Sequence, residues 1–155
     1  MRLKKKLAPG AVGSCESAAP LYSFMCHGMR LYNLTNVRWH WAKKKKYTDA
    51  VRSGVTLAFS FEVGISLDQI ALECARVRIT IAHKGVFDHD GMYSAAKPVL
   101  DAIVARPIKY GLITLRIRRW GLIVDDSPKH IDLEVRQEKG EYGVFIEVWE
   151  VKKRS

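Results

Sequence analysis

Polar and apolar residues alternate in three segments of this chain. This alternation restricts the possible folds of the chain more than any other feature of the sequence. The segments are 76–81, 131–136 and 144–148. Successive side chains of a strand point to opposite faces, so each run predicts a strand with one buried face. A turn segment with Gly140 and Gly143 separates the last two runs. It predicts that these two strands form an antiparallel hairpin.

Helical periodicity appears in two other segments. Apolar residues recur every three or four positions over 41–61, which predicts a helix with its lysines on the opposite face. Residues 55–63 include several with a preference for β-structure, so a strand over 55–63 is an alternative to the later part of this helix. A second helix is expected over 95–104, with Pro98 near its first turn, and an edge strand within 21–30. The sequence thus predicts an α+β fold, with a small mixed or antiparallel sheet and packed helices.

The charge of the chain points to a polyanionic partner. Lys and Arg number 26 against 16 Asp and Glu, a net charge of +10. A surplus of this size in a small domain favours nucleic acid. Two basic segments stand out as candidate DNA contacts. They consist of Arg38 with Lys43, Lys44, Lys45 and Lys46, and of Arg116, Arg118 and Arg119.

The length of 155 residues fits one domain. We expect residues 1–20 to be a basic flexible tail and 21–155 to be the domain. Pro9 and Gly10 interrupt the apolar stretch that a signal peptide needs. The three scattered cysteines suggest reduced thiols in the cytoplasm, and no apolar run approaches the roughly 18 residues of a membrane-spanning helix. We therefore expect a cytoplasmic protein without a membrane partner.

Aspartates gather in two short motifs. Asp88 and Asp90, two apart on an extended segment, would point to the same face at roughly 6–7 Å. If Asp125 or Asp126 folds beside them, three carboxylates converge, and such hard oxygen ligands suit Mg²⁺ or Mn²⁺. An acidic metal site in a basic protein is typical of a metal-dependent nuclease.

Four motifs in a fixed order sharpen this interpretation. The chain reads NLTNVRWHWA at 33–42, DHD at 88–90, KPVLDAI at 97–103 and WGLIVDDSP at 120–128. In combination, over roughly residues 21–150, they resemble the RusA family of Holliday-junction resolvases. The resemblance implies a homodimeric α+β endodeoxyribonuclease, encoded by a bacterium or a phage, that cuts four-way DNA junctions with Mg²⁺. Mn²⁺ is expected to substitute for Mg²⁺.

The same resemblance implies roles for individual residues. It makes Asp88, Asp90 and Asp126 the catalytic metal ligands and Lys97 the catalytic cation. Supporting roles fall to Asp125 and Asp101, and Asp101 lies one helical turn after Lys97, where an ion pair is favourable. Of the two neighbours Asp125 and Asp126, the resemblance alone assigns Asp126 as the metal ligand.

This chain departs from the family pattern at two places. Gly91 stands where the pattern has Asn, so a polar contact near the metal is expected to be missing. Residues 104–120 form a basic insertion, interpreted as an extra loop or hairpin arm that could touch DNA. The alternative function is a junction-binding protein of the same fold with weak or lost catalysis.

Overall fold

A computed structural model describes residues 18–64, 71–110, 113–118 and 120–152. The elements confirm the α+β class. In chain order they are β1 (Tyr22–His27), α1 (Trp41–Glu62), β2 (Ala75–His83), α2 (His89–Ile103), β3 (Pro107–Tyr110), β4 (Ile113–Arg118), β5 (Ile131–Lys139) and β6 (Gly143–Glu150).

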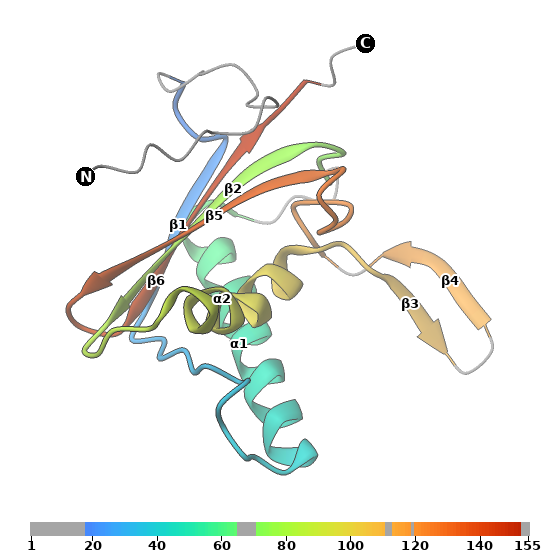
Figure 1. The fold of residues 1–155 in the computed structure, drawn as a ribbon. Helices are drawn as coiled ribbons and strands as arrows, with labels where there is room; N and C mark the ends of the chain where they lie inside the picture. Colours follow the sequence, from blue (N-terminus) through green and yellow to red (C-terminus); the bar gives the residue numbers. More distant parts are fainter. Residues whose placement is uncertain (1–17, 65–70, 111–112, 119, 153–155) are drawn as a thin grey trace.

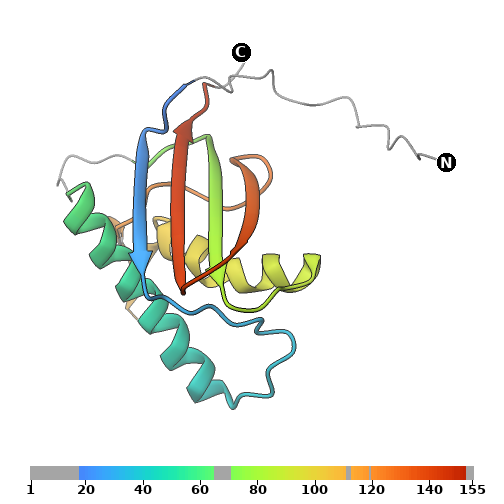
Figure 2. The same cartoon turned by 90° about the vertical axis from the view of Figure 1, so that its left-hand side faces the viewer.

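The main sheet is mixed and has the strand order β1-β6-β2-β5. Strand β6 runs antiparallel to both β1 and β2, whereas β5 runs parallel to β2. Both helices cover the same face of this sheet (Figures 1 and 2). The predicted edge strand is confirmed as β1, at one end of the order.

The predicted hairpin of β5 and β6 is wrong, because β2 lies between these two strands. The side chains of Val77, Ile79 and Ile81 in β2 are fully buried. Pairing on both sides gives β2 two ladders of hydrogen bonds and places its apolar face at the centre of the sheet. Alternation predicted the strands correctly, but it does not say which strands are neighbours.

The helix α1 packs on the sheet through one apolar stripe. Its residues Val51, Val55 and Phe59 are buried, and the Phe59 ring meets Phe24 of β1 edge-on at 5.2 Å between centroids. Because α1 continues to Glu62, the strand alternative for its later part is wrong. A stripe at helical spacing buries these rings against the sheet, and this packing outweighs the local β preference.

The helix α2 begins at His89, six residues before the expected start at position 95. Asp88 is its N-cap, and the Asp88 carboxylate accepts a hydrogen bond from the Gly91 N–H at 2.8 Å. An aspartate cap satisfies an N–H that has no partner within the helix, which explains the early start. Pro98 accordingly lies inside the helix rather than in its first turn, and it is buried.

The basic insertion forms a separate two-stranded antiparallel sheet of β3 and β4. This hairpin projects away from the main sheet (Figure 1). The hairpin form expected within 104–120 is therefore present in β3 and β4, whereas the status of this range as an insertion and its contact with DNA stay predictions. Arg119, and most of the predicted tail at 1–20, lie outside the described residues.

Two cysteines lie within the described residues, Cys26 and Cys74, and both are free thiols. Burial, together with the nearby charge of Glu62, raises the pKa of Cys26 to about 12, so this thiol stays protonated at neutral pH. None of the helices in the described part of the chain is long and apolar enough to cross a membrane.

Candidate active site

Lys97 lies at the centre of a charged cluster that joins two of the sequence motifs. Its ammonium group pairs with the carboxylate of Asp126, 29 positions further along the chain, and with that of Asp101 at 3.0 Å. Asp101 in turn accepts a hydrogen bond from the Arg106 guanidinium at 3.0 Å. The expected pair of Lys97 and Asp101 is therefore confirmed.

The segment before Asp126 is fixed by burial and by backbone hydrogen bonds. Leu122 and Ile123 are fully buried. The Leu122 N–H donates to the carbonyl of Ile103 at 2.7 Å, and its own carbonyl accepts from the Leu72 N–H at 2.8 Å. A segment held on both sides presents the following aspartates in a defined position beside the end of α2. The Asp126 N–H donates to the Asp125 carboxylate at 2.9 Å, so Asp125 shapes this turn.

The ion pairs shift both partners in the direction that keeps them charged. Partial burial opposes the charge on Lys97, but hydrogen bonds to Asp126 and Asp101 outweigh it and raise the pKa of Lys97. The hydrogen bond from Lys97, against some burial, lowers the pKa of Asp126, and the charge of Arg106 adds to this. At neutral pH the cluster therefore holds a fixed ammonium group beside two carboxylates.

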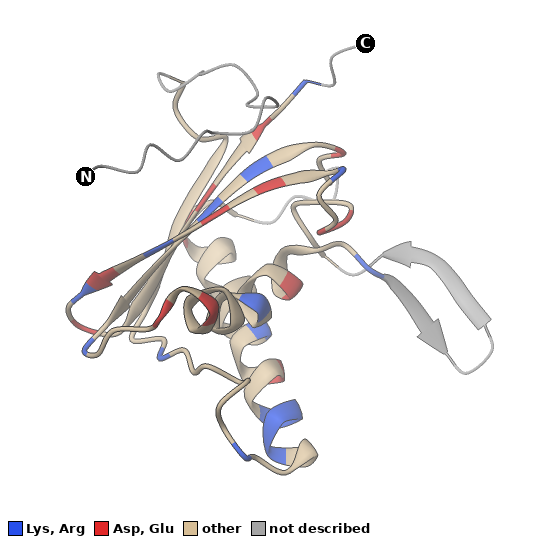
Figure 3. Cartoon of the chain, in the orientation of Figure 1, with Lys and Arg blue, Asp and Glu red and all other residues tan. Residues whose placement is uncertain are grey.

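Asp88 and Asp90 lie at the start of α2 and differ in their surroundings. The extended geometry expected for them is wrong, because Asp88 caps the helix and Asp90 is in its first turn. The Asp90 side chain is fully exposed, with the exposed His89 ring 3.5 Å from its carboxylate. Figure 3 shows acidic residues, in red, at the beginning of α2. An exposed carboxylate at a helix N-terminus is available to a ligand from solvent.

The structure explains why residue 91 is glycine. A Cβ atom there would lie 2.4 Å from the Asp88 carboxylate and 2.7 Å from the Asn33 amide nitrogen. Real Cβ atoms do not approach other atoms so closely, so a side chain at position 91 would force the Asp88 carboxylate and the Asn33 amide to shift, and glycine leaves both in place. An amide side chain therefore lies beside position 91 after all, supplied by Asn33 instead of residue 91.

Sequence reasoning did not single out Asn33 as a site residue, although it opens the first of the four motifs. Asn33 belongs to a turn in which its side-chain oxygen accepts from the Thr35 N–H at 3.1 Å. The Thr35 hydroxyl is 2.8 Å from that of Ser94 in α2. The first motif thus docks on the helix that carries Asp88, Asp90 and Lys97.

The donor chemistry of the aspartates suits Mg²⁺, since all are hard oxygen ligands and Asp90 is exposed. Their arrangement fits less well. Within the described ranges, no three His, Cys, Asp or Glu side chains lie together as a group that could hold a metal ion. Asp126 is instead paired with Lys97. The structure therefore brings Asp126, Lys97 and Asp101 together, but it does not assemble the predicted three-carboxylate group.

The basic residues of α1 begin at its N-terminal end. His40 is the N-cap, and its ring nitrogen accepts from the Ala42 N–H at 3.3 Å. The Lys43 ammonium lies 4.5 Å from the centroid of the Trp39 ring, and Lys45 pairs with Asp49 at 2.6 Å. Figure 3 shows this end of the helix in blue, projecting beyond the sheet.

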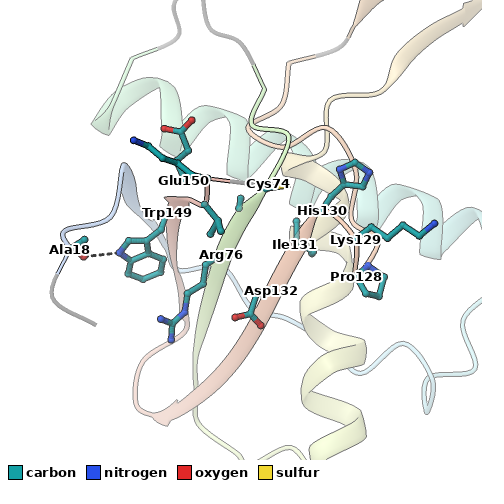
Figure 4. A pocket seen from close by; sticks show the side chains of 13 residues that line it. Ala18, Cys74, Arg76, Pro128, Lys129, His130, Ile131, Asp132, Trp149 and Glu150 are labelled. Atoms are coloured by element: carbon teal, nitrogen blue, oxygen red, sulfur yellow. Dashed lines mark hydrogen bonds between the residues drawn. The ribbon is translucent and has the colours of Figure 1, made fainter. Parts of the chain in front are cut away.

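A cavity of about 530 Å³ lies elsewhere, at the ends of β2, β5 and β6. Figure 4 shows that Trp149 and Arg76 form one wall, and that Pro128 and His130 form another. The indole N–H of Trp149 donates to the Ala18 carbonyl at 2.9 Å. None of the aspartates in the candidate site lines this cavity.

No protein-family model, curated protein sequence or solved structure matches this chain.

Proposed function

We propose that this protein is a Mg²⁺-dependent endodeoxyribonuclease of the RusA type that resolves four-way DNA junctions as a homodimer. The observation that carries the proposal is the contact of Lys97 with Asp126 and Asp101. These residues come from two of the four motifs that carry the resemblance, KPVLDAI and WGLIVDDSP, and the chain folds so that they meet. The net charge of +10 supports a polyanionic substrate.

The chemistry of phosphodiester hydrolysis matches the residues of the site. The resemblance assigns Mg²⁺ to Asp88, Asp90 and Asp126, which do not form one group among the described residues and would have to converge on the ion. Mg²⁺ bound there would supply an activated water and a polarised phosphate. Lys97 lies where it can offset negative charge on the phosphate or on the leaving oxygen, and its raised pKa keeps it charged for this role. Asp101 and Asp125 orient Lys97 and the Asp126 turn, respectively.

A second candidate function is junction binding with weak or lost catalysis. The observation in its favour is the lack, among the described residues, of a three-carboxylate group. In this case the basic surfaces would bind branched DNA, and the ion pair of Lys97 with Asp126 would serve stability alone.

A cleavage assay on a synthetic four-way junction separates the two functions. We expect paired nicks with Mg²⁺ or Mn²⁺, and binding without cutting in Ca²⁺, because its looser coordination positions water poorly. A linear duplex of the same sequence is the control substrate. Full cutting in EDTA would exclude the metal mechanism, whereas tight binding without cutting in any metal would establish the second candidate.

The oligomeric state is tested in the same samples. A four-way junction has two-fold symmetry and needs two symmetric nicks, so one site per chain implies a two-fold dimer. We expect sedimentation to show a dimer at micromolar concentration. A monomer both with and without junction DNA contradicts the proposal.

The lysines of α1 offer a separate test of DNA binding. Changing Lys43, Lys44, Lys45 and Lys46 together to Gln removes four positive charges. If each touched a phosphate, the slope of log affinity against log salt would fall by about 3.6. We expect a fall of about two, because Lys45 already pairs with Asp49 and Lys43 lies over Trp39.

The matched control for this variant removes four exposed basic residues away from α1. They are Lys84, Arg136, Lys139 and Lys152, again changed to Gln. Fluorescence anisotropy with labelled junction DNA from 50 to 200 mM salt measures both slopes. Equal slopes in the two variants would show that the α1 lysines make no specific contribution.

A further inference from the structure

A smaller cavity, about 200 Å³, lies one helical turn beyond Lys97, between α1 and the end of α2. Its walls come from four parts of the chain. They are Arg52 and Thr56 of α1, Asp101 and Ala102 of α2, Val104 and Arg106 in the segment that follows, and Trp120. The volume is several times that of a water molecule, and a phosphate group with its five heavy atoms fits within it.

The charge around this cavity is positive. Two guanidinium groups, those of Arg52 and Arg106, line it together with one carboxylate, that of Asp101. The negative charge of Asp101 is already shared, since Arg106 and Lys97 each lie 3.0 Å from it. Lys97 and Arg106 therefore each have a carboxylate partner in this cluster, whereas Arg52 takes part in none of the ion pairs found among the described residues.

Donors of hydrogen bonds are also in excess on these walls. Guanidinium groups donate only and bind phosphate oxygens through two parallel hydrogen bonds. The Trp120 side chain also lines the cavity, although its indole N–H is buried and has no hydrogen-bond partner among the described residues. An anion with several oxygen atoms supplies acceptors for the two guanidinium groups.

We propose that this cavity is a subsite for a DNA backbone phosphate, bound chiefly by Arg52 and Arg106, next to the phosphate that is cut. This inference rests on the proposed function. The four positions from Lys97 to Asp101 span about 6 Å along α2, so the subsite lies close enough for a neighbouring phosphate of the same strand. A phosphodiester carries a single negative charge, which can pair with the guanidinium of Arg52.

The first arm of the test uses inorganic phosphate and needs no DNA. In the two-dimensional ¹⁵N–¹H NMR spectrum of the full chain, four tryptophans give indole signals, and the variant Trp120→Phe assigns the one from Trp120. We expect phosphate to shift the Trp120 signal in the wild type and not in Arg52→Gln. A wild-type spectrum that phosphate leaves unchanged at this signal overturns the subsite.

The second arm uses junction DNA and measures binding by anisotropy in Ca²⁺. For Arg52→Gln we expect about tenfold weaker binding and a salt slope that is smaller by about 0.9. Arg52→Lys should restore the slope but only part of the affinity, because an ammonium lacks the planar fork. The control is Arg136→Gln, which removes the same type of charge from β5, where Arg136 pairs with Glu134. The Arg136→Gln variant should change the slope of log affinity against log salt less than Arg52→Gln does, because Arg136 is not part of the subsite.

The two arms distinguish the possible outcomes. A shift with free phosphate but an unchanged DNA slope in Arg52→Gln would make the cavity a site for a free phosphate and overturn the DNA subsite. Equal salt slopes for Arg52→Gln and Arg136→Gln would also overturn the DNA subsite. If the wild type binds no DNA at all, the proposed function fails, whereas the phosphate arm still shows whether the cavity binds an anion.

Discussion

Replacing Asp90 with Asn should reduce junction cleavage by about a hundredfold or more while junction binding stays unchanged or tightens. The variant keeps the size of the side chain but removes a hard oxygen ligand and one negative charge facing the DNA. Losses of this size are common when one charged group of a catalytic site is removed. Single-turnover cleavage with Mg²⁺, together with anisotropy in Ca²⁺, measures the two effects separately.

Asp90 gives a cleaner test than the other aspartates. Its side chain is fully exposed, so Asp90→Asn leaves the fold undisturbed. Asp126→Asn would also release Lys97, and Asp88→Asn would alter the cap of α2. The matched control is Asp132→Asn, an exposed aspartate of β5 outside the site. If the Asp90→Asn variant cleaves the junction at the wild-type rate, Asp90 is not a metal ligand.

Gly121→Ala should destabilise the protein by about 3 kcal/mol, the upper end of the usual cost of overpacking. A Cβ atom at this position would lie 2.2 Å from the backbone nitrogen of Ala105 and 2.6 Å from the carbonyl carbon of Val104. Backbone atoms cannot rotate away as a flexible side chain can, so one of the two segments must move. For a chain of this size the expected fall in melting temperature is about 10 °C.

The same substitution should also impair the site, because Gly121 opens the segment that carries Asp126. Displacing this segment weakens the hydrogen bond from the Leu122 N–H to the Ile103 carbonyl and loosens the pair of Asp126 with Lys97. Gly140→Ala is the control, since a Cβ atom at residue 140 would have no other atom within 4 Å, and its stability should stay within about 0.5 kcal/mol of the wild type. Equal melting temperatures for the two variants, measured by circular dichroism, would contradict the close packing at Gly121.

Local sequence patterns predicted most of the elements but not their neighbours. The alternating runs became β2, β5 and β6, and the apolar periodicity of 41–61 became α1. Whether β5 pairs with β6 depends instead on which arrangement buries the most apolar surface and satisfies the most backbone groups. That comparison involves the whole chain, and β2 takes the central place because both of its edges find partners.

In the candidate site, too, local sequence predicted some features, whereas the contacts between elements required the folded structure. The positions of the charged residues, the helical spacing of Lys97 and Asp101, and the order of the four motifs can all be read from the amino-acid sequence. The pairing of Asp126 with Lys97, the place of Asn33 beside Gly91, and the capping role of Asp88 depend on the folding of the whole chain. Spacing along the chain fixes geometry within one element, because a helix or strand has a known rise per residue. Contacts between elements depend on how buried segments such as 121–123 pack, and the packing of the whole core sets that.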